Sequence, residues 1–273
     1  MPELPEVETT RRGIEPHLVG RRIARVVVRN PRLRWRVPAA LLKQLPGQRI
    51  DAVTRRAKYL LLATSAGTVI VHLGMSGSLR ITDSNTPAGK FDHVELILEN
   101  GDCLRLRDPR RFGAFLWTTA PAQAHKLLAG LGPEPLGDDF SGAHLHRISR
   151  GRTRAIRDFL LDGRIVAGIG NIYANEALFA AGIRPTRPAG RVSLAEYDRL
   201  AAAVRTTLKR ALRAGGTTLR DFRSASDKAG YFQLSLKVYG RDGQPCLTCR
   251  TPIRLRRLGQ RSAFYCAHCQ TVD

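Results

Sequence analysis

The sequence is short of the features that mark membrane and secreted proteins. No apolar run in its 273 residues is long enough to span a bilayer, and no signal-peptide pattern follows Met1. Acidic residues are also scarce, with 23 Asp and Glu against 45 Lys and Arg, which gives a formal net charge of +22. Cysteine occurs only five times, and four of the five lie near the end of the chain. We therefore expect a soluble intracellular protein that has no disulfide framework.

The excess of basic residues favours a polyanionic partner. These residues extend from Arg11 to Arg261 rather than forming one tail, so they indicate a charged face on a folded body. Nucleic acid is the leading candidate for the partner. An anionic membrane surface is the competing interpretation, and the lack of a membrane-spanning run argues against it.

The pattern of apolar residues changes along the chain. A short helix is predicted from Pro5, and β-branched or alternating runs up to about residue 120 then predict a mostly antiparallel sheet or sandwich. These runs are RIARVVVRN, RIDAVTRRAKYLLLAT, GTVIVHLGM, FDHVELILEN, DCLRLRD and FGAFLWTT. The Gly- and Pro-rich stretch LGPEPLGDDF then predicts an interdomain linker. Helices are predicted after it in SGAHLHRIS, RTRAIRDFLLD and IYANEALFAAG, and in a long run that begins with Ser193 and Glu196 as a capping box. Strand-like alternation returns from about residue 230.

The cysteines near the end of the chain form two C-x-x-C pairs. Cys246 and Cys249 are followed after sixteen residues by Cys266 and Cys269. Two such pairs can deliver four thiolates to one tetrahedral Zn²⁺ on a small β-hairpin, which predicts one structural zinc ion without an open catalytic position. A redox pair or chance spacing is the alternative. Cys103 stands alone in a strand-like run and is expected to be a small buried apolar residue.

Four motifs together resemble the bacterial formamidopyrimidine-DNA glycosylase family. They are MPELPEVE, DPRRFG, GIGNIYANEALF and the four-cysteine finger, and the resemblance runs nearly from end to end. It implies an α+β multidomain fold: an N-terminal β-sandwich catalytic domain with flanking helices over residues 1–120, a helix-two-turns-helix DNA-binding domain over 121–232, and a C-terminal zinc-finger β-hairpin over 233–273. The helical domain is expected to end in a lesion-recognition loop at TTLRDFRSASDKAGYFQ.

The resemblance implies an enzyme that excises oxidised purines, such as 8-oxoguanine and formamidopyrimidines, from duplex DNA and then cleaves the strand at the abasic site. Leu4 and the intact DPRRFG resemble the purine-directed branch of the family rather than endonuclease VIII-type members, which act on oxidised pyrimidines. The expected partner is double-stranded DNA containing oxidised purines, with no membrane involved. We expect a monomer in the bacterial cytoplasm, associated with the nucleoid through DNA.

Pro2 is the predicted nucleophile. Removal of Met1 would expose a secondary amine, and a terminal amine has a reference pKa of about 7.7–8.0. Its attack on the sugar would lead to an iminium without an N–H, which stays cationic and promotes elimination of both flanking phosphates. The resemblance assigns sugar protonation and proton shuttling to Glu3 and a supporting role to Glu6. Taken alone, however, Pro followed by Glu is ordinary chemistry for the start of a helix.

The remaining predicted site residues would hold and open the DNA. The resemblance places Lys58 and Arg261 in the catalytic set as contacts to phosphates near the lesion, and His72, Asn171 and Arg157 among the DNA-binding residues. Arg157 stands where lysine is expected in several relatives. Met75, Arg110 and Phe112 are predicted to fill the space that the extruded nucleotide leaves. Taken alone, Met75 and Phe112 would be core residues, and Asn171 a helix cap.

Three other functions are compatible with parts of this pattern. A non-catalytic zinc-finger DNA-binding protein would explain the charge and the cysteines but would leave Pro2 and Glu3 without a role. An enzyme that uses an N-terminal proline as a general base on small keto or enol substrates would have no use for the charge or the finger. An endonuclease VIII-type glycosylase would differ in its preferred lesion.

Overall fold

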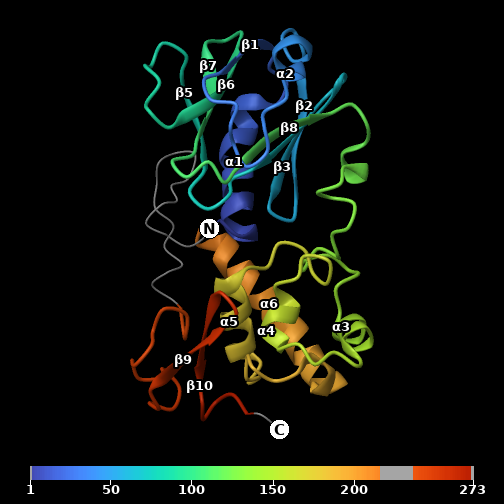
Figure 1. The fold of residues 1–273 in the computed structure, drawn as a ribbon, viewed down its shortest axis with the longest axis vertical. Helices are drawn as coiled ribbons and strands as arrows, with labels where there is room; N and C mark the ends of the chain where they lie inside the picture. The colour runs from blue at the N-terminus through green and yellow to red at the C-terminus, as the bar shows by residue number, and fades with distance from the viewer. Residues whose placement is uncertain (1, 216–235, 272–273) are drawn as a thin grey trace. The chain divides into compact units, whose positions relative to one another are not determined.

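A computed structural model describes residues 2–215 and 236–271 of the chain. The chain divides into two compact units, one comprising Met1–Ala129 with Ala214–Gln233 and the other Gly130–Arg213 with Leu234–Asp273 (Figure 1). The predicted lesion-recognition loop, residues 217–233, lies outside the described residues.

The first unit is a sandwich of two antiparallel sheets, as predicted. One sheet has the order β1-β6-β7-β5 and the other β2-β3-β4-β8. The strands are β1 (Ile23–Val28), β2 (Ile50–Arg56), β3 (Tyr59–Thr64), β4 (Gly67–His72), β5 (Ser78–Asp83), β6 (Asp92–Leu98), β7 (Asp102–Arg107) and β8 (Ala114–Thr118). One apolar core takes residues from strands of both sheets and from the N-terminal helix. The alternation of apolar residues in the sequence therefore reports a real pair of half-buried sheets.

Parts of this unit differ from the sequence prediction. The long run from Arg49 to Thr64 is a hairpin of β2 and β3, which a tight turn separates at Ala57, whose φ is +53°. β5 was not predicted, although Leu79 and Ile81 alternate with polar residues along it; only its first two residues are buried. The short helices α2 (Ala40–Gln44) and η1 (Ala122–Ala124) were also not predicted.

The N-terminal helix α1 (Leu4–Leu18) forms where Pro5 and the spacing of apolar residues predicted a helix. Val7, Thr10 and Ile14 are buried on one face, three or four residues apart. Proline is tolerated in the first turn because the amide that it lacks would have no partner within the helix. Figure 1 shows α1 beside strands of both sheets, and its contacts include β2 and β5.

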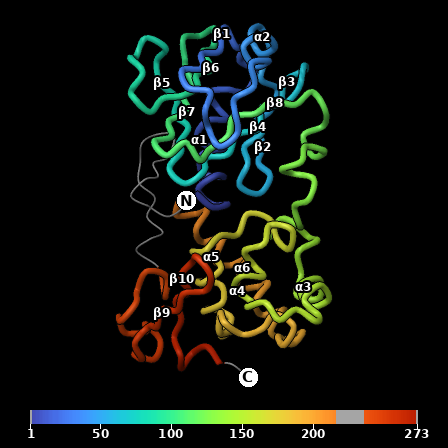
Figure 2. The backbone as a smooth tube through the Cα atoms, viewed as in Figure 1, coloured from blue at the N-terminus to red at the C-terminus, as the bar shows by residue number. Residues whose placement is uncertain are grey.

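The second unit contains the predicted helices, which follow one another in the tube of Figure 2. They are α3 (Gly142–Ser149), α4 (Ile156–Leu160), α5 (Asn171–Ala180) and α6 (Leu194–Arg213); the short helix η2 (Ala189–Arg191) was not predicted. α4 and α5 are joined by a stretch of irregular turns, which is the helix-two-turns-helix arrangement that the resemblance implied. The capping box is confirmed, since the Ser193 amide donates to Glu196 Oε2 at 2.8 Å and the Glu196 amide to Ser193 Oγ at 3.4 Å.

The second unit also contains the zinc-finger hairpin of β9 (Ile253–Leu258) and β10 (Arg261–Cys266). β10 packs against α5. Residues 236–240 form turns instead of the predicted strand. No helix in the described part of the chain is long and apolar enough to cross a membrane.

Candidate active site and zinc centre

The first turn of α1 fixes the peptide group that follows Pro2. The amide of Glu3, which belongs to the Pro2–Glu3 peptide, donates a 2.8 Å hydrogen bond to Glu6 Oε2. Glu3 is 2% exposed and Glu6 is fully buried. Glu6 therefore orients the backbone beside Pro2, and the positive end of the α1 dipole lies at the same place.

Lys58 lies in the tight turn between β2 and β3, next to Ala57. This turn is tied to the first half of α1 through Arg55. Arg55 Nη1 donates to the Ala57 carbonyl at 2.8 Å, and its Nε donates to Glu8 Oε2 at 3.3 Å. The fold thus links Lys58 to the helix that follows Pro2, although Lys58 and Pro2 are far apart in sequence.

His72 ends β4, where it pairs with Tyr59 on one side and Ala114 on the other. The Gly74 amide donates to His72 Nδ1 at 3.0 Å, so in the neutral ring the proton resides on Nε2. Burial, assisted by the positive charges of Lys58 and Arg34, lowers the pKa of His72 to about 4. At neutral pH, His72 is consequently an uncharged hydrogen-bond donor with a fixed tautomer.

The three residues predicted to fill the DNA stack come together on two neighbouring loops. Met75 is 37% exposed and Phe112 is 44% exposed, so neither is the core residue that its type alone would suggest. The Arg110 guanidinium lies 4.9 Å from the centre of the Phe112 ring. An apolar pair with an adjacent cation is therefore presented at the surface.

Sequence reasoning missed the residues that join these two loops. Asp108 is fully buried and accepts hydrogen bonds from Ser76 Oγ at 2.9 Å and from the Gly113 amide at 2.8 Å. Ser76 Oγ also accepts a bond from the Arg110 amide at 3.2 Å. Gly74 has a φ of +64°, and a Cβ there would lie 2.4 Å from the Phe112 carbonyl carbon. The Asp that opens DPRRFG was the available signal, since Asp commonly bonds the backbone of its own turn.

Arg34 is another residue near the site that the sequence did not single out. Its amide donates to the Gly113 carbonyl at 3.1 Å, and its charge contributes to the lowered pKa of His72. It lies in irregular backbone between β1 and α2, where no motif marks it. The first unit thus brings three cations, Lys58, Arg34 and Arg110, to the segments that surround His72 and Met75.

The second unit holds the other predicted contacts. Asn171 is the first residue of α5, and its Nδ2 donates to the Ser262 carbonyl at 2.9 Å. Arg261 opens β10 and is exposed. Arg157, in contrast, is fully buried and donates to carbonyl oxygens of the finger. Its guanidinium bonds groups within the protein, and the DNA contact expected for it stays a prediction.

The zinc finger brings its four thiols together. The sulfur atoms of Cys246, Cys249, Cys266 and Cys269 all lie within 4.8 Å of one another. Two of these separations are 3.9 Å, between Cys246 and Cys269, and 3.4 Å, between Cys249 and Cys266. Tetrahedral zinc with Zn–S bonds of about 2.3 Å requires sulfur atoms about 3.8 Å apart, so the set fits one structural Zn²⁺. Cys103 is buried in β7, as expected.

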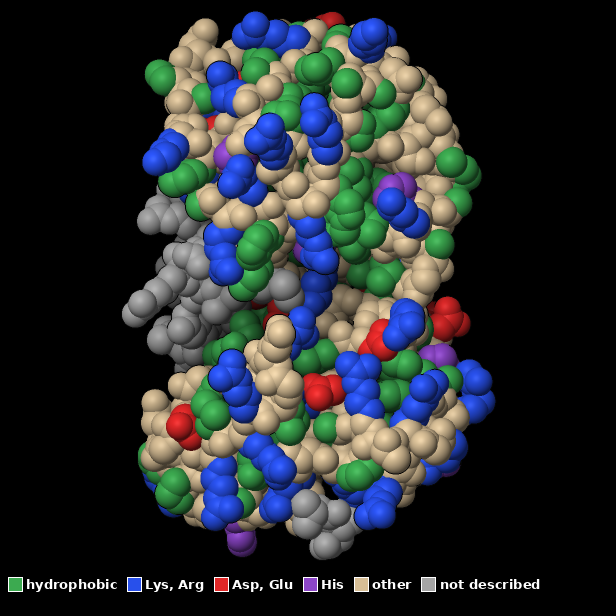
Figure 3. All heavy atoms as spheres, in the orientation of Figure 1, with side chains coloured by type: hydrophobic (Ala, Val, Ile, Leu, Met, Phe, Trp, Pro, Cys, Tyr) green, Lys and Arg blue, Asp and Glu red, His purple; other side chains and the backbone are tan. Residues whose placement is uncertain are grey.

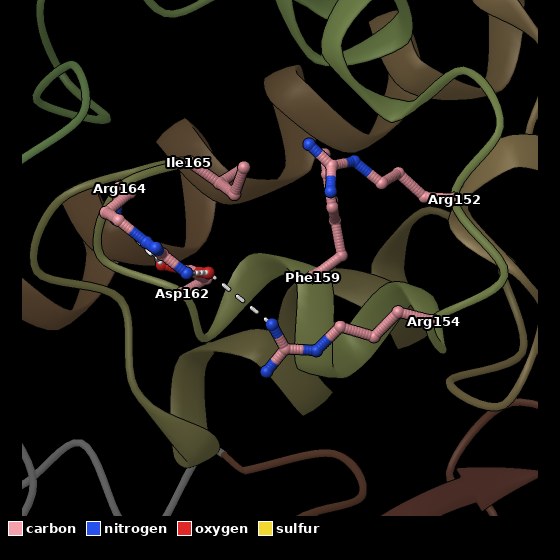
Figure 4. Close-up of a pocket in the computed structure, with 6 residues that line it drawn as sticks. All are labelled: Arg152, Arg154, Phe159, Asp162, Arg164 and Ile165. Carbon is pink, nitrogen blue, oxygen red and sulfur yellow. Dashed lines mark hydrogen bonds and ion pairs between the residues drawn. The ribbon is translucent and has the colours of Figure 1, made fainter.

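A pocket of about 330 Å³ lies in the second unit, outside the predicted site residues (Figure 4). Its lining is Arg152, Arg154, Phe159, Asp162, Arg164 and Ile165. Asp162 pairs with Arg164 at 2.8 Å and with Arg154 at 3.5 Å. The hydrogen bond from Arg164 lowers the pKa of Asp162, so this carboxylate stays ionised and neutralises part of the arginine charge.

The face seen in Figure 3 carries many Lys and Arg side chains and few acidic ones.

Comparison with known proteins assigns the family. The model of the formamidopyrimidine-DNA glycosylase N-terminal domain matches residues 1–115, that of the H2TH domain matches 131–223, and that of the zinc finger found in FPG and IleRS matches 243–272. The formamidopyrimidine-DNA glycosylase of Stutzerimonas stutzeri is 60% identical over 99% of this chain and 100% of its own length. The chain belongs to the formamidopyrimidine-DNA glycosylase family.

Other members of this family have similar sequences and folds. The formamidopyrimidine-DNA glycosylase of Nitrosococcus oceani is 57% identical over 99% of this chain and 100% of its own. The crystal structure of the MutM (Fpg) protein from Thermus thermophilus superposes with a TM-score of 0.89 at 38% identity, covering 98% of each chain. Lactococcus lactis Fpg in complex with DNA that contains an abasic site gives a TM-score of 0.90 at 31% identity, covering 99% of this chain and 100% of the other.

Proposed function

We propose that this chain is a bifunctional DNA glycosylase and abasic-site lyase of base excision repair, which removes 8-oxoguanine and formamidopyrimidines from duplex DNA. The observation that carries the proposal is the arrangement at the start of α1, where Glu6 holds the Pro2–Glu3 peptide at 2.8 Å and Glu3 is buried. Family membership supports it, because Lactococcus lactis Fpg occurs in complexes with DNA that contains Fapy-dG or an abasic site.

The proposed reaction begins after Met1 has been removed. The Pro2 nitrogen forms a bond to the sugar C1′, the electron pair of the glycosidic bond leaves with the damaged base, and the proton of the Pro2 amine passes to that base. Glu3 protonates the ring oxygen of the sugar, so the ring opens to a cationic iminium. The iminium acidifies the C2′ proton, and loss of that proton expels the 3′ phosphate. A second elimination expels the 5′ phosphate.

The other predicted residues serve the opening and holding of the duplex. Extrusion of a nucleotide costs a few kcal/mol, and Met75 and Phe112 would offset that cost by entering the stack. Arg110, which lies over the Phe112 ring, would hydrogen-bond the base that has lost its partner. His72 would donate from Nε2 to a phosphate, and Lys58 would contribute charge.

In the second unit, the proposed phosphate contacts are Arg261 and the backbone amides at the start of α5. Amide groups at a helix N-terminus point outward and carry partial positive charge, which suits an anionic oxygen. Gly170 precedes the helix as its N-cap and has no side chain to occupy that space. Contacts to phosphates do not distinguish one base from another, so these residues would position the DNA strand without selecting the lesion.

Borohydride trapping on a duplex with 8-oxoguanine opposite cytosine tests the proposal. We expect a covalent adduct on Pro2 of Met1-cleaved protein, located by mass spectrometry, and none with Pro2→Gly. A matched control is Pro5→Gly, which changes a proline of the same helix turn but leaves the terminal amine. Adduct formation on a lysine, together with full strand cleavage by Pro2→Gly, would refute the assignment.

The same experiment separates the alternative functions. A non-catalytic zinc-finger protein would bind the duplex and give no adduct with any lesion. An endonuclease VIII-type enzyme would be trapped faster on oxidised thymine than on 8-oxoguanine. We further propose that the enzyme acts as a monomer, since one chain carries both Pro2 and the finger, and that it works on nucleoid DNA in the bacterial cytoplasm. Light scattering of the enzyme on the duplex checks the one-to-one stoichiometry.

A further inference from the structure

Arg157 lies at the second position of α4, and one guanidinium group contacts both sides of the finger turn. Its Nη2 donates to the Leu258 carbonyl at 3.0 Å, and its Nη1 donates to the Arg261 carbonyl at 3.1 Å. Leu258 is the last residue of β9 and Arg261 the first of β10. The two carbonyls therefore flank the hairpin turn, and Arg157 bridges them.

The same guanidinium reaches the start of α5. Nη1 donates to Asn171 Oδ1 at 3.3 Å, and Nε donates to Asp158 Oδ1 at 3.0 Å. Arg157 has no exposed side-chain surface, so its charge is compensated within the protein, by Asp158. An arginine can make these contacts at once because its donors are fixed in a planar fork, whereas lysine offers one nitrogen.

Helix α5 continues the contact along β10. Asn171 Nδ2 donates to the Ser262 carbonyl at 2.9 Å, and Asn175 Oδ1 accepts the Phe264 amide at 2.8 Å. Asn171 and Asn175 are four residues apart and so lie on one face of the helix. Polar side chains of α5 thus hold β10 in register, and Arg157 extends this contact to the hairpin tip, where the side chain of Arg261 is exposed.

We propose that Arg157 is a positioning residue for DNA binding and does not contact DNA itself. It fixes the hairpin tip against the start of α5, so that Arg261 and the α5 amide groups are held at a constant separation. Two phosphates of one strand would then meet preorganised partners. The inference rests on the proposed function, since the phosphates belong to the lesion-containing strand.

A double-mutant cycle tests this inference. Arg157→Lys keeps the charge but replaces the planar fork of donor nitrogens with one ammonium nitrogen, so we expect about tenfold weaker binding to a duplex with a non-cleavable abasic analogue, equivalent to one lost charged hydrogen bond. If Arg157 acts through Arg261, the same substitution in an Arg261→Ala background will cost less than about twofold. Arg154→Lys is the matched control, because Arg154 is exposed and outside this contact; we expect less than a twofold change.

Two results would overturn the inference. If Arg157→Lys weakens duplex binding equally in the wild-type and Arg261→Ala proteins, Arg157 contributes to binding independently of Arg261. If Arg157→Lys leaves duplex binding unchanged, the positive charge at this position is sufficient for binding, as it would be for a direct contact with a phosphate.

A measurement on the protein alone separates this inference from the proposed function. Arg157→Lys should speed amide hydrogen exchange at residues 258–262 while zinc content stays at one ion per chain. Faster exchange at the tip in a protein that never forms a borohydride adduct would refute the proposed function but leave the role of Arg157 in the fold. Unchanged exchange at the tip would refute the positioning role, whatever the activity.

Discussion

Lowering the pH should destabilise the first unit through His72. The pKa of His72 is lowered from 6.5 to about 4, mainly because the ring is buried. Between these two values the unfolded chain binds a proton that the folded protein does not. The stability contributed by His72 is therefore complete above pH 6.5 and falls as the pH decreases towards 4.

The size of this effect follows from the difference between the two pKa values. One pKa unit corresponds to about 1.4 kcal/mol, so a shift from 6.5 to about 4 corresponds to roughly 3 kcal/mol when the whole range is crossed. About 2 kcal/mol of this should already be lost between pH 7 and pH 5. That loss is a large fraction of the stability of an ordinary domain.

Tryptophan fluorescence can follow this unit selectively. The chain has two tryptophans, Trp35 and Trp117, and both lie in the first unit. Urea unfolding at pH 7 and pH 5 would be compared for the wild-type chain and for His72→Asn. Asn can keep the acceptor for the Gly74 amide but does not titrate, so other acidic and basic groups cancel in the difference.

We expect the wild-type protein to lose about 2 kcal/mol more than His72→Asn between these pH values. Nuclear magnetic resonance of the imidazole should show a titration midpoint near 4. A midpoint above 6, or equal losses in the two proteins, would refute the conclusion that His72 is a buried neutral donor.

The remaining predictions concern the two loops and the finger. Gly74→Ala should lower the urea midpoint of the first unit by an amount equivalent to about 2–3 kcal/mol, because the added Cβ would meet the Phe112 backbone at 2.4 Å; an unchanged midpoint would contradict the strain. Met75→Ala should change the free energy of unfolding by less than about 0.5 kcal/mol but slow 8-oxoguanine excision about tenfold in single-turnover assays, and a core role would show the reverse. Cys249→Ser should abolish the bound zinc in metal analysis and, with it, duplex binding; a full zinc content in this variant would mean that the four-thiolate site is wrong.

Local features of the sequence predicted a large part of the fold. The ligand pairs of the finger are each three residues apart, and the Ser193–Glu196 capping box spans one helical turn, so short-range geometry determines both. The sandwich followed from alternating apolar residues, since a half-buried strand has a period of two. The alternation did not reveal the tight turn at Ala57, which divides one apolar run into two strands, and the short strand β5 was missed although Leu79 and Ile81 alternate with polar residues.

The candidate site was predicted as a set of residues, but the states of those residues were decided by tertiary contacts. The joining of the Met75 and Phe112 loops depends on Asp108, which bonds Ser76 across 32 positions of sequence. The protonation state of His72 depends on burial and on cations from other segments, and the hydrogen bonds of Arg157 depend on carbonyls about a hundred residues away. The sequence by itself determined which chemical groups this protein has; only the tertiary structure decided which are desolvated, paired or exposed, because desolvation and hydrogen bonding act over a few ångströms of space.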